Sequence, residues 1–157
     1  MARRRSAAPT GVEPAPSPVP GSDIFVGHWT YRSFLNRAEH VDDINQLLFA
    51  EAELVFEKAS SGEVKGALNM GETGSLTIKG TVVNGNPVSF RFQGVGEIAG
   101  SPSRGWVYDY IGWYVPTWPN GVDQKPAIVG SVIRTVAHSN GQAKAGVVAS
   151  FIATKRD

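Results

Sequence analysis

From Asp23 to the end of the chain, apolar and polar residues alternate with a period of two almost throughout, which is typical of β-strands with one buried face. At positions 88–93, for example, Val88, Phe90 and Phe92 alternate with polar residues. The alternation predicts eight strands, at residues 24–33, 48–58, 63–70, 75–83, 88–98, 106–115, 127–138 and 144–156.

The segments between these strands are mostly short and rich in turn-forming residues. Asn84-Gly85 and Asn140-Gly141 tolerate positive φ and are typical of tight hairpins. Consecutive strands joined by such turns pair antiparallel, and closure of eight strands removes the exposed sheet edges. The sequence therefore predicts an all-β fold, an eight-stranded antiparallel up-and-down β-barrel. The longer connection at 37–47 holds either one short helical turn or a loop.

Residues 1–22 have a different composition from the rest of the chain. Five of the ten prolines fall there, and Ile, Leu, Phe, Trp and Tyr are absent. Such a segment cannot bury enough apolar surface to offset its ordering entropy, so we expect a disordered arm at 1–22 and one barrel domain at 23–157. No apolar run follows Arg3, Arg4 and Arg5, so a secretory signal is not predicted and we expect a cytoplasmic protein.

The overall composition excludes several kinds of chemistry. Without cysteine the chain has no disulfide, thiolate metal site or cysteine nucleophile. Its three histidines lack metal-ligand spacing, and no phosphate-binding or nucleophile-elbow motif is present, so we expect no metal and no cofactor. A net charge of +1 argues against nucleic acid as a partner, and no apolar run is long enough for a membrane span.

The first and last predicted strands resemble those of a known superfamily. Gly27-His28-Trp29 is similar to the Gly-x-Trp that opens the first strand of the calycin barrels, which include lipocalins and avidins. The segment 150–156 resembles the basic last strand that closes such barrels. The resemblance implies an eight-stranded barrel that holds a ligand.

The densest group of aromatic residues lies between positions 104 and 124. Alternation places Trp106, Tyr108, Tyr110 and Tyr114 on one face of a strand. If that face points inward, the rings form a flat-walled apolar pocket with phenol hydroxyls as orienting groups. Alternatively, the rings fill the barrel or lie at a subunit interface. Glycines on facing strands favour a cavity, namely Gly66, Gly80, Gly94 and Gly130. The predicted ligand-binding residues are Trp29, Tyr31, Phe90, Phe92, Trp106, Tyr108, Tyr110, Tyr114, Trp118 and Arg134.

Arg134 shares the predicted inward face of its strand with Ile128 and Val132, an unusual place for a charge. The calycin resemblance implies an arginine packed over Trp29 at the closed end. The other interpretation is an anchor for an anionic group of a ligand. Trp118 lies in a long proline-bounded loop, where it serves as a lid, an oligomer contact or a cap folded over the barrel end.

Three functions remain open. The first is binding of a small hydrophobic or aromatic molecule in the barrel. The second is a barrel enzyme, a cyclase, isomerase or lyase, with Tyr108, Asp109, Tyr110 and Arg134 as the catalytic candidates. The third is a structural module, because outward apolar stripes favour a homo-oligomer under any function; these are Val95, Val107, Ile111, Trp113, Val129, Ile133 and Val147.

Overall fold

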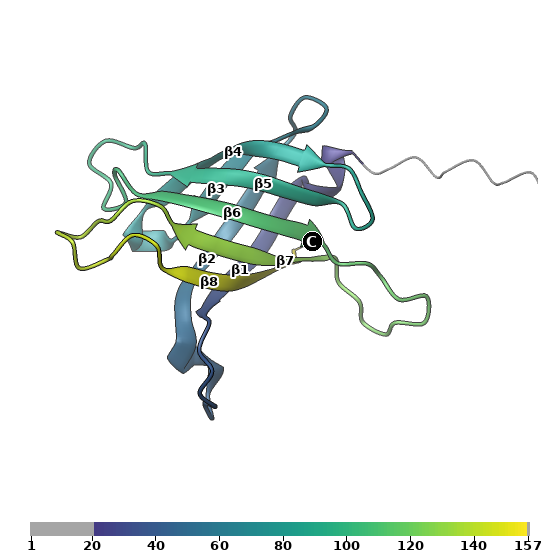
Figure 1. The fold of residues 1–157 in the computed structure, drawn as a ribbon. Coiled ribbons are helices and arrows are strands. Elements are labelled where there is room, and N and C mark those ends of the chain that lie inside the picture. Colours follow the sequence, from purple (N-terminus) through teal and green to yellow (C-terminus); the bar gives the residue numbers. More distant parts are fainter. Residues whose placement is uncertain (1–20, 157) are drawn as a thin grey trace, which may run out of the picture.

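A computed structural model describes residues 21–156 and shows a closed barrel of eight antiparallel strands (Figure 1). Each strand pairs with the next along the chain, and β8 pairs with β1 to close the barrel. This confirms the all-β up-and-down barrel. The strands are β1 (Gly27–Leu35), β2 (Leu48–Glu57), β3 (Glu63–Asn69), β4 (Ser75–Val83), β5 (Ser89–Val95), β6 (Val107–Tyr114), β7 (Ala127–Arg134) and β8 (Val148–Lys155).

Several predicted strand ends are wrong by a few residues. The first strand begins at Gly27, because Ser22–Phe25 forms the 3-10 helix η1. β5 and β7 end before their predicted limits, and β8 begins at Val148 instead of residue 144. The arm predicted at 1–22 lies outside the described residues except for Gly21 and Ser22, and Ser22 is buried as the first residue of η1.

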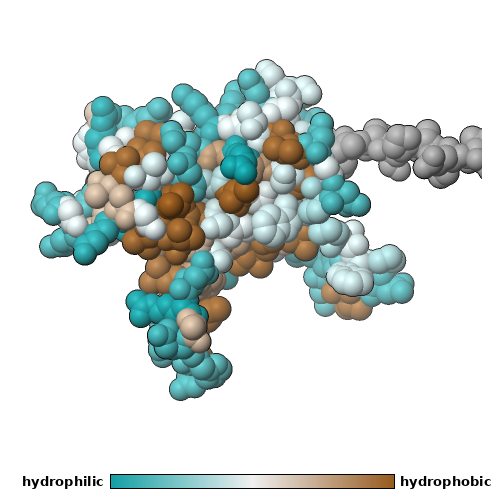
Figure 2. Space-filling model, viewed as in Figure 1, coloured by the Kyte–Doolittle hydropathy of each residue, from teal (hydrophilic) through white to brown (hydrophobic). Residues whose placement is uncertain are grey.

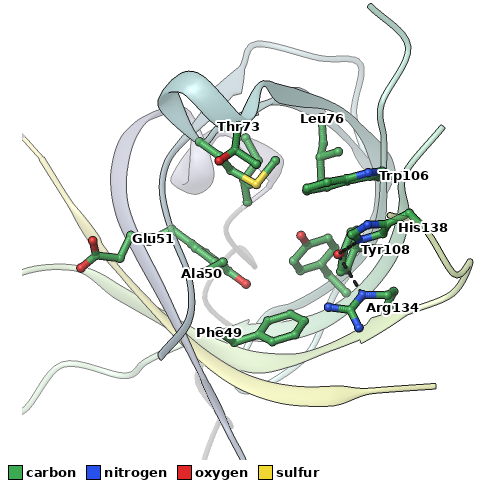
Figure 3. A pocket seen from close by; sticks show the side chains of 13 residues that line it. Phe49, Ala50, Glu51, Thr73, Leu76, Trp106, Tyr108, Arg134 and His138 are labelled. Carbon is green, nitrogen blue, oxygen red and sulfur yellow. Dashed lines mark hydrogen bonds between the residues drawn. The ribbon is translucent and has the colours of Figure 1, made fainter. Parts of the chain in front are cut away.

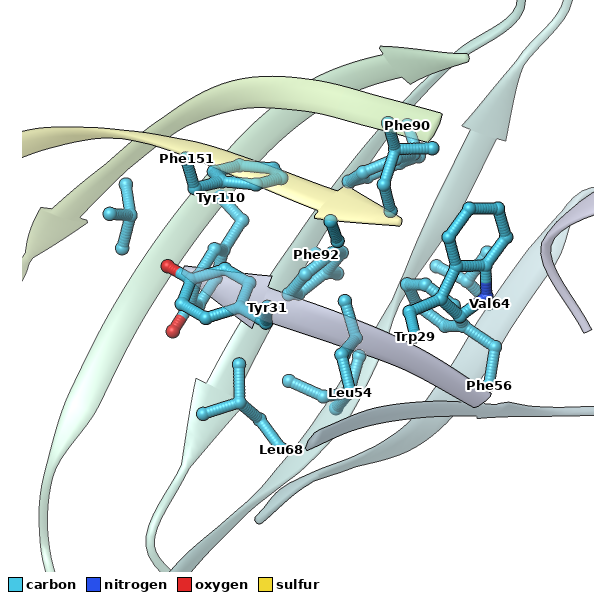
Figure 4. Close-up of a cluster of buried hydrophobic side chains, with 14 of the residues drawn as sticks. Trp29, Tyr31, Leu54, Phe56, Val64, Leu68, Phe90, Phe92, Tyr110 and Phe151 are labelled. Carbon is cyan, nitrogen blue, oxygen red and sulfur yellow. The ribbon is translucent and has the colours of Figure 1, made fainter. Parts of the chain in front are cut away.

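One end of the barrel is closed by η1 and Trp29 (Figure 4). The indole Nε1 of Trp29 donates a hydrogen bond of 2.7 Å to the carbonyl oxygen of Phe25, and both side chains are completely buried. The Nζ of Lys155 lies 5.6 Å from the Trp29 ring centroid. The cation over this tryptophan is therefore a lysine of the last strand, and the packing of Arg134 over Trp29 is not observed, because Arg134 lies beside Phe49 and Tyr108.

The half of the barrel next to this end is filled by aromatic rings. Phe90 and Phe92 stack with centroids 5.2 Å apart, and Phe92 stacks on Tyr110 at 4.5 Å. The rings of Phe56 and Phe25 complete the layer. Of the aromatic residues predicted on one face at 104–124, Tyr110 therefore also packs against this core.

Gly112 and Gly130 face one another across β6 and β7 and make room for this core. A Cβ on Gly130 would lie 2.0 Å from the carbonyl oxygen of Ile111 and 2.8 Å from the Phe151 ring. The space beside Gly130 is thus filled by an aromatic ring, and this glycine does not create the cavity that the sequence led us to expect there.

The β1–β2 hairpin extends beyond the other strands at the opposite end of the barrel (Figure 1). Its connection contains the 3-10 helix η2 (Ile44–Leu47), where the Asp43 side chain accepts a hydrogen bond from the Asn45 amide. This is the short helical turn predicted within 37–47. Among residues 21–156, no helix is long and apolar enough to cross a membrane.

Candidate functional site

A cavity of about 240 Å³ lies at the end of the barrel opposite Trp29 (Figure 3). We call it the mouth pocket. Aromatic and aliphatic side chains make up most of its wall, and Arg134 and His138 approach it from one side. It is lined by Tyr31, Phe49, Ala50, Glu51, Leu68, Met70, Thr73, Leu76, Trp106, Tyr108, Tyr110, Arg134 and His138.

Strand register brings the polar residues of the mouth pocket together. Tyr108 on β6 and Arg134 on β7 are directly paired, so both side chains point into the barrel at the same level. His138 follows β7 and forms an isolated bridge with Ala143, which folds the loop back toward the pocket. Its imidazole stacks on Trp106 with centroids 3.9 Å apart and an interplanar angle of 16°.

A β-bulge places one aromatic side chain in the wall. Ser33 pairs with Ala50, whereas the next residue of β1 pairs with Leu48, so Phe49 is the extra residue. In a regular strand, adjacent side chains point to opposite faces. Because a bulge changes the direction of side chains, the adjacent residues Phe49 and Ala50 both line the pocket here. The Cζ of Arg134 lies 5.1 Å from the centroid of this ring.

The three polar residues form a chain of hydrogen bonds. The Nε of Arg134 donates to the Tyr108 hydroxyl at 3.1 Å, and that hydroxyl lies 2.7 Å from Nε2 of His138. Nδ1 of His138 lies 2.9 Å from the Ser139 hydroxyl. Burial, and to a smaller extent the Arg134 charge, lower the pKa of His138. The imidazole is therefore neutral at pH 7, so one ring nitrogen donates a hydrogen bond and the other accepts one.

Two further tyrosines form the inner end of the pocket. Burial raises the pKa of Tyr31 and of Tyr110 well above the ordinary value. The two rings lie edge to face with centroids 6.3 Å apart. Both phenols therefore remain neutral, so the charge in the pocket comes from Arg134.

The residues predicted to bind a ligand fall into three places. Five of them line the mouth pocket: Tyr31, Trp106, Tyr108, Tyr110 and Arg134. Trp29, Phe90 and Phe92 are buried in the filled half, and Tyr114 packs against that core. Trp118 is 78% exposed in the β6–β7 loop, which leaves the barrel at the end opposite the pocket, so it neither caps nor covers the mouth pocket (Figure 1).

The catalytic candidates also separate. Tyr108, Tyr110 and Arg134 line the mouth pocket. Asp109 points to the outer surface of the barrel, where its carboxylate accepts hydrogen bonds from Gln93 at 2.9 Å and Thr135 at 2.8 Å. The direct acid or base role considered for Asp109 is therefore not available inside this pocket.

The sequence interpretation missed several pocket residues, above all His138 and Phe49. No binding role was predicted for His138, yet it is half-buried because its ring stacks on Trp106 and bonds to Tyr108. Phe49 is on the polar side of its strand by simple alternation, and only the bulge brings it inward. Neither long-range stacking nor a bulge has a signal in the local sequence pattern.

Within residues 21–156, no three His, Cys, Asp or Glu side chains gather where they could hold a metal ion. A scan of protein-family models and a search of curated proteins both found no match to this chain. The eight-stranded antiparallel barrel is consistent with a calycin-like fold.

Proposed function

We propose that this protein binds a small hydrophobic or aromatic molecule in the mouth pocket. The observation that supports the proposal is a cavity of about 240 Å³ with aromatic walls at one end of a barrel whose other end is filled. Pockets for drug-sized ligands occupy roughly 300–1,000 Å³, so this one suits a compound of about one ring. The calycin resemblance of the first strand agrees with the proposal, because calycin barrels hold ligands.

The tryptophans of the chain provide a direct test. Trp106 lines the mouth pocket, whereas Trp29 is in the closed end and Trp113 and Trp118 are exposed. On titration with benzyl alcohol, we expect the indole N–H signal of Trp106 to shift in a saturable manner in a nitrogen–proton correlation spectrum. The signals of the other three tryptophans should stay in place.

A matched pair of variants separates pocket binding from surface binding. Ala50→Phe places a ring in the mouth pocket and should abolish the Trp106 shift. Ser61→Phe adds the same ring in the exposed β2–β3 turn at the closed end and should leave the shift unchanged. An Ala50→Phe protein that binds benzyl alcohol like the wild type would overturn the proposal.

The hydrogen-bond chain favours a second candidate function, proton transfer in the same pocket. A neutral His138 can accept a proton, Tyr108 can relay one, and Arg134 can stabilise negative charge that develops on a substrate oxygen. These are the groups that a cofactor-independent isomerase, lyase or cyclase needs.

A nitrobenzisoxazole tests this candidate without knowledge of the natural substrate. A base removes the ring C–H proton, the N–O bond breaks, and a coloured cyanonitrophenolate forms. We expect the rate to rise with pH through the His138 pKa and to disappear in His138→Asn, while His40→Asn in the exposed β1–β2 loop has no effect. A rate no greater than that of free imidazole at the same concentration would exclude the candidate.

We also propose that a second copy of the chain covers the outer face of β6, β7 and β8. Figure 2 shows apolar atoms gathered on this side of the barrel. Trp113, Val129 and Ile152 are neighbours across the three strands, and Ile133 pairs with Val148. Val148 and Ile152 provide the outward apolar residues of β8, in place of the predicted Val147. Such a face packs against its own copy about a two-fold axis.

A further inference from the structure

Arg134 is a cation inside a largely apolar pocket. It extends from the inner face of β7, where Ile128 and Val132 on the same face are completely or almost completely buried. Its guanidinium lies 5.1 Å from the Phe49 ring centroid and 5.8 Å from that of Tyr108. Arg134 is half-buried, and a charge that is partly removed from water is stabilised by polar or anionic partners.

The described part of the protein provides acceptors for only some of the N–H donors of the Arg134 guanidinium. Nε donates to the Tyr108 hydroxyl at 3.1 Å, and Nη1 donates to the carbonyl oxygen of Lys144 at 3.0 Å. These are its hydrogen bonds within residues 21–156, so Nη2 has no protein acceptor there. No carboxylate of the same residues forms an ion pair with Arg134.

The acidic residue at the edge of the pocket is already engaged elsewhere. Glu51 points away from the cavity in Figure 3, and its carboxylate forms an ion pair with Arg32 at 3.5 Å on the outer surface. The positive charge of the mouth pocket is therefore not neutralised by the described part of the chain.

We propose that the ligand of the mouth pocket is a small aromatic carboxylate whose anionic group binds Arg134. This inference rests on the proposed binding function and specifies the class of ligand. A guanidinium pairs with a planar carboxylate through charge-assisted hydrogen bonds, and Nη2 is free to donate one.

The remainder of the pocket matches the rest of such a molecule. Phe49, Trp106 and Tyr108 offer ring faces and edges beside Arg134, and Leu68 and Leu76 provide aliphatic surface. Arg134 is the one side chain with a permanent positive charge among the described residues that line the pocket, which favours a singly charged anion over a phosphate dianion. A volume of about 240 Å³ leaves room for one ring and its carboxylate.

Benzoate and benzamide form a matched probe pair, because they share shape and differ in charge. Isothermal titration calorimetry on the full chain should give benzoate an affinity at least about tenfold higher than that of benzamide. Arg134→Gln should remove this preference, so that both compounds bind with similar affinity. Arg91→Gln, a change of the same kind at an exposed position of β5, should retain it.

The possible results separate this inference from the proposed function. If benzamide shifts the Trp106 signal and binds as tightly as benzoate, the carboxylate inference fails while aromatic binding stands. If neither compound binds, both fail. A preference for benzoate that persists in Arg134→Gln also overturns the inference. Circular dichroism checks that the variant is folded; if it is not, the wild-type comparison of benzoate with benzamide decides.

Discussion

At the scale of single residues, the position of His138 depends on partners that are distant along the chain. The imidazole lies against Trp106 and bonds to Tyr108. These two residues precede β7 in the chain, whereas His138 follows it. Burial and the Arg134 charge disfavour its protonated form. The consequence is a neutral base held beside a phenol, in a pocket that keeps one permanent cation.

The pKa of His138 gives a direct check of this environment. Removal of the Arg134 charge in Arg134→Gln should raise the pKa of His138, but only part of the way to 6.5, because burial is the larger cause. A proton NMR titration of the imidazole measures it. Arg91→Gln on the exposed face of β5 should leave the value unchanged, and a His138 pKa that falls or stays constant in Arg134→Gln would contradict the assigned cause.

The same shift has a consequence for stability. Because the folded-state pKa is below 6.5, the unfolded chain binds this proton more readily than the folded chain. Above pH 6.5, His138 is neutral in both states and does not lower the free energy of unfolding. As the pH falls from 6.5 toward the folded-state pKa, the unfolded chain takes up the proton first, so the free energy of unfolding decreases.

At the scale of elements, the packing of the core against β6 and β7 depends on two paired glycines. Gly112 and Gly130 let the Phe90 and Phe151 rings lie directly on the backbone of the two strands. Any larger residue would compete with main-chain atoms that are fixed by the barrel hydrogen bonds.

Gly130→Ala should therefore destabilise the protein by about 1–3 kcal/mol, the usual cost of overpacking a core. Its Cβ would lie 2.0 Å from the carbonyl oxygen of Ile111 and 2.8 Å from the Phe151 ring, so the strands must separate and the ring must move. Gly21→Ala is the control, since no atom lies within 4 Å of a Cβ at that position. Urea denaturation measures both variants, and equal stability of the two would refute the packing argument.

The elements also show how far the sequence could predict the structure. Alternation located all eight strands, because each has one buried face. It could not find η1, since Ile24 and Phe25 continue the apolar pattern of β1. The alternation also identified Arg134 as inward-facing. It could not show whether Trp29 or Tyr108 would be the neighbour of Arg134, because alternation gives the face of the strand on which a residue lies and not its position along the barrel axis. Alternation also failed to place Phe49 in the pocket, because a bulge shifts the alternation by one residue.

At the scale of the whole molecule, two sides of the outer surface of the barrel differ in polarity. The outer face of β1 and β2 carries a hydrogen bond between His28 and Glu53 and an ion pair between Arg32 and Glu51. The outer face of β6, β7 and β8 instead exposes Trp113 and Ile152 by 42% and 44%. Single exposed apolar residues are common, but a contiguous group across three strands is typical of an interface.

We expect the wild-type protein to form a homo-oligomer in solution through this face. Ile152→Lys places a charge at its centre and should shift the population to monomer, measured by light scattering after size-exclusion chromatography. Ile44→Lys makes the same change in η2, where the side chain is 57% exposed and away from the face, and should have no effect. A wild-type protein that is monomeric at high concentration would contradict the expectation.

The closed end of the barrel has a consequence for exchange of the proposed ligand. Trp29 and η1 fill that end, so we expect a ligand to enter and leave through the mouth alone, and a second molecule to wait until the first has left. Replacement must proceed through an empty state, and the observed rate of ligand exchange at saturating competitor should equal the dissociation rate of the first ligand, independent of which competitor follows. We therefore expect the residence time of the bound ligand alone to set the rate at which it is replaced.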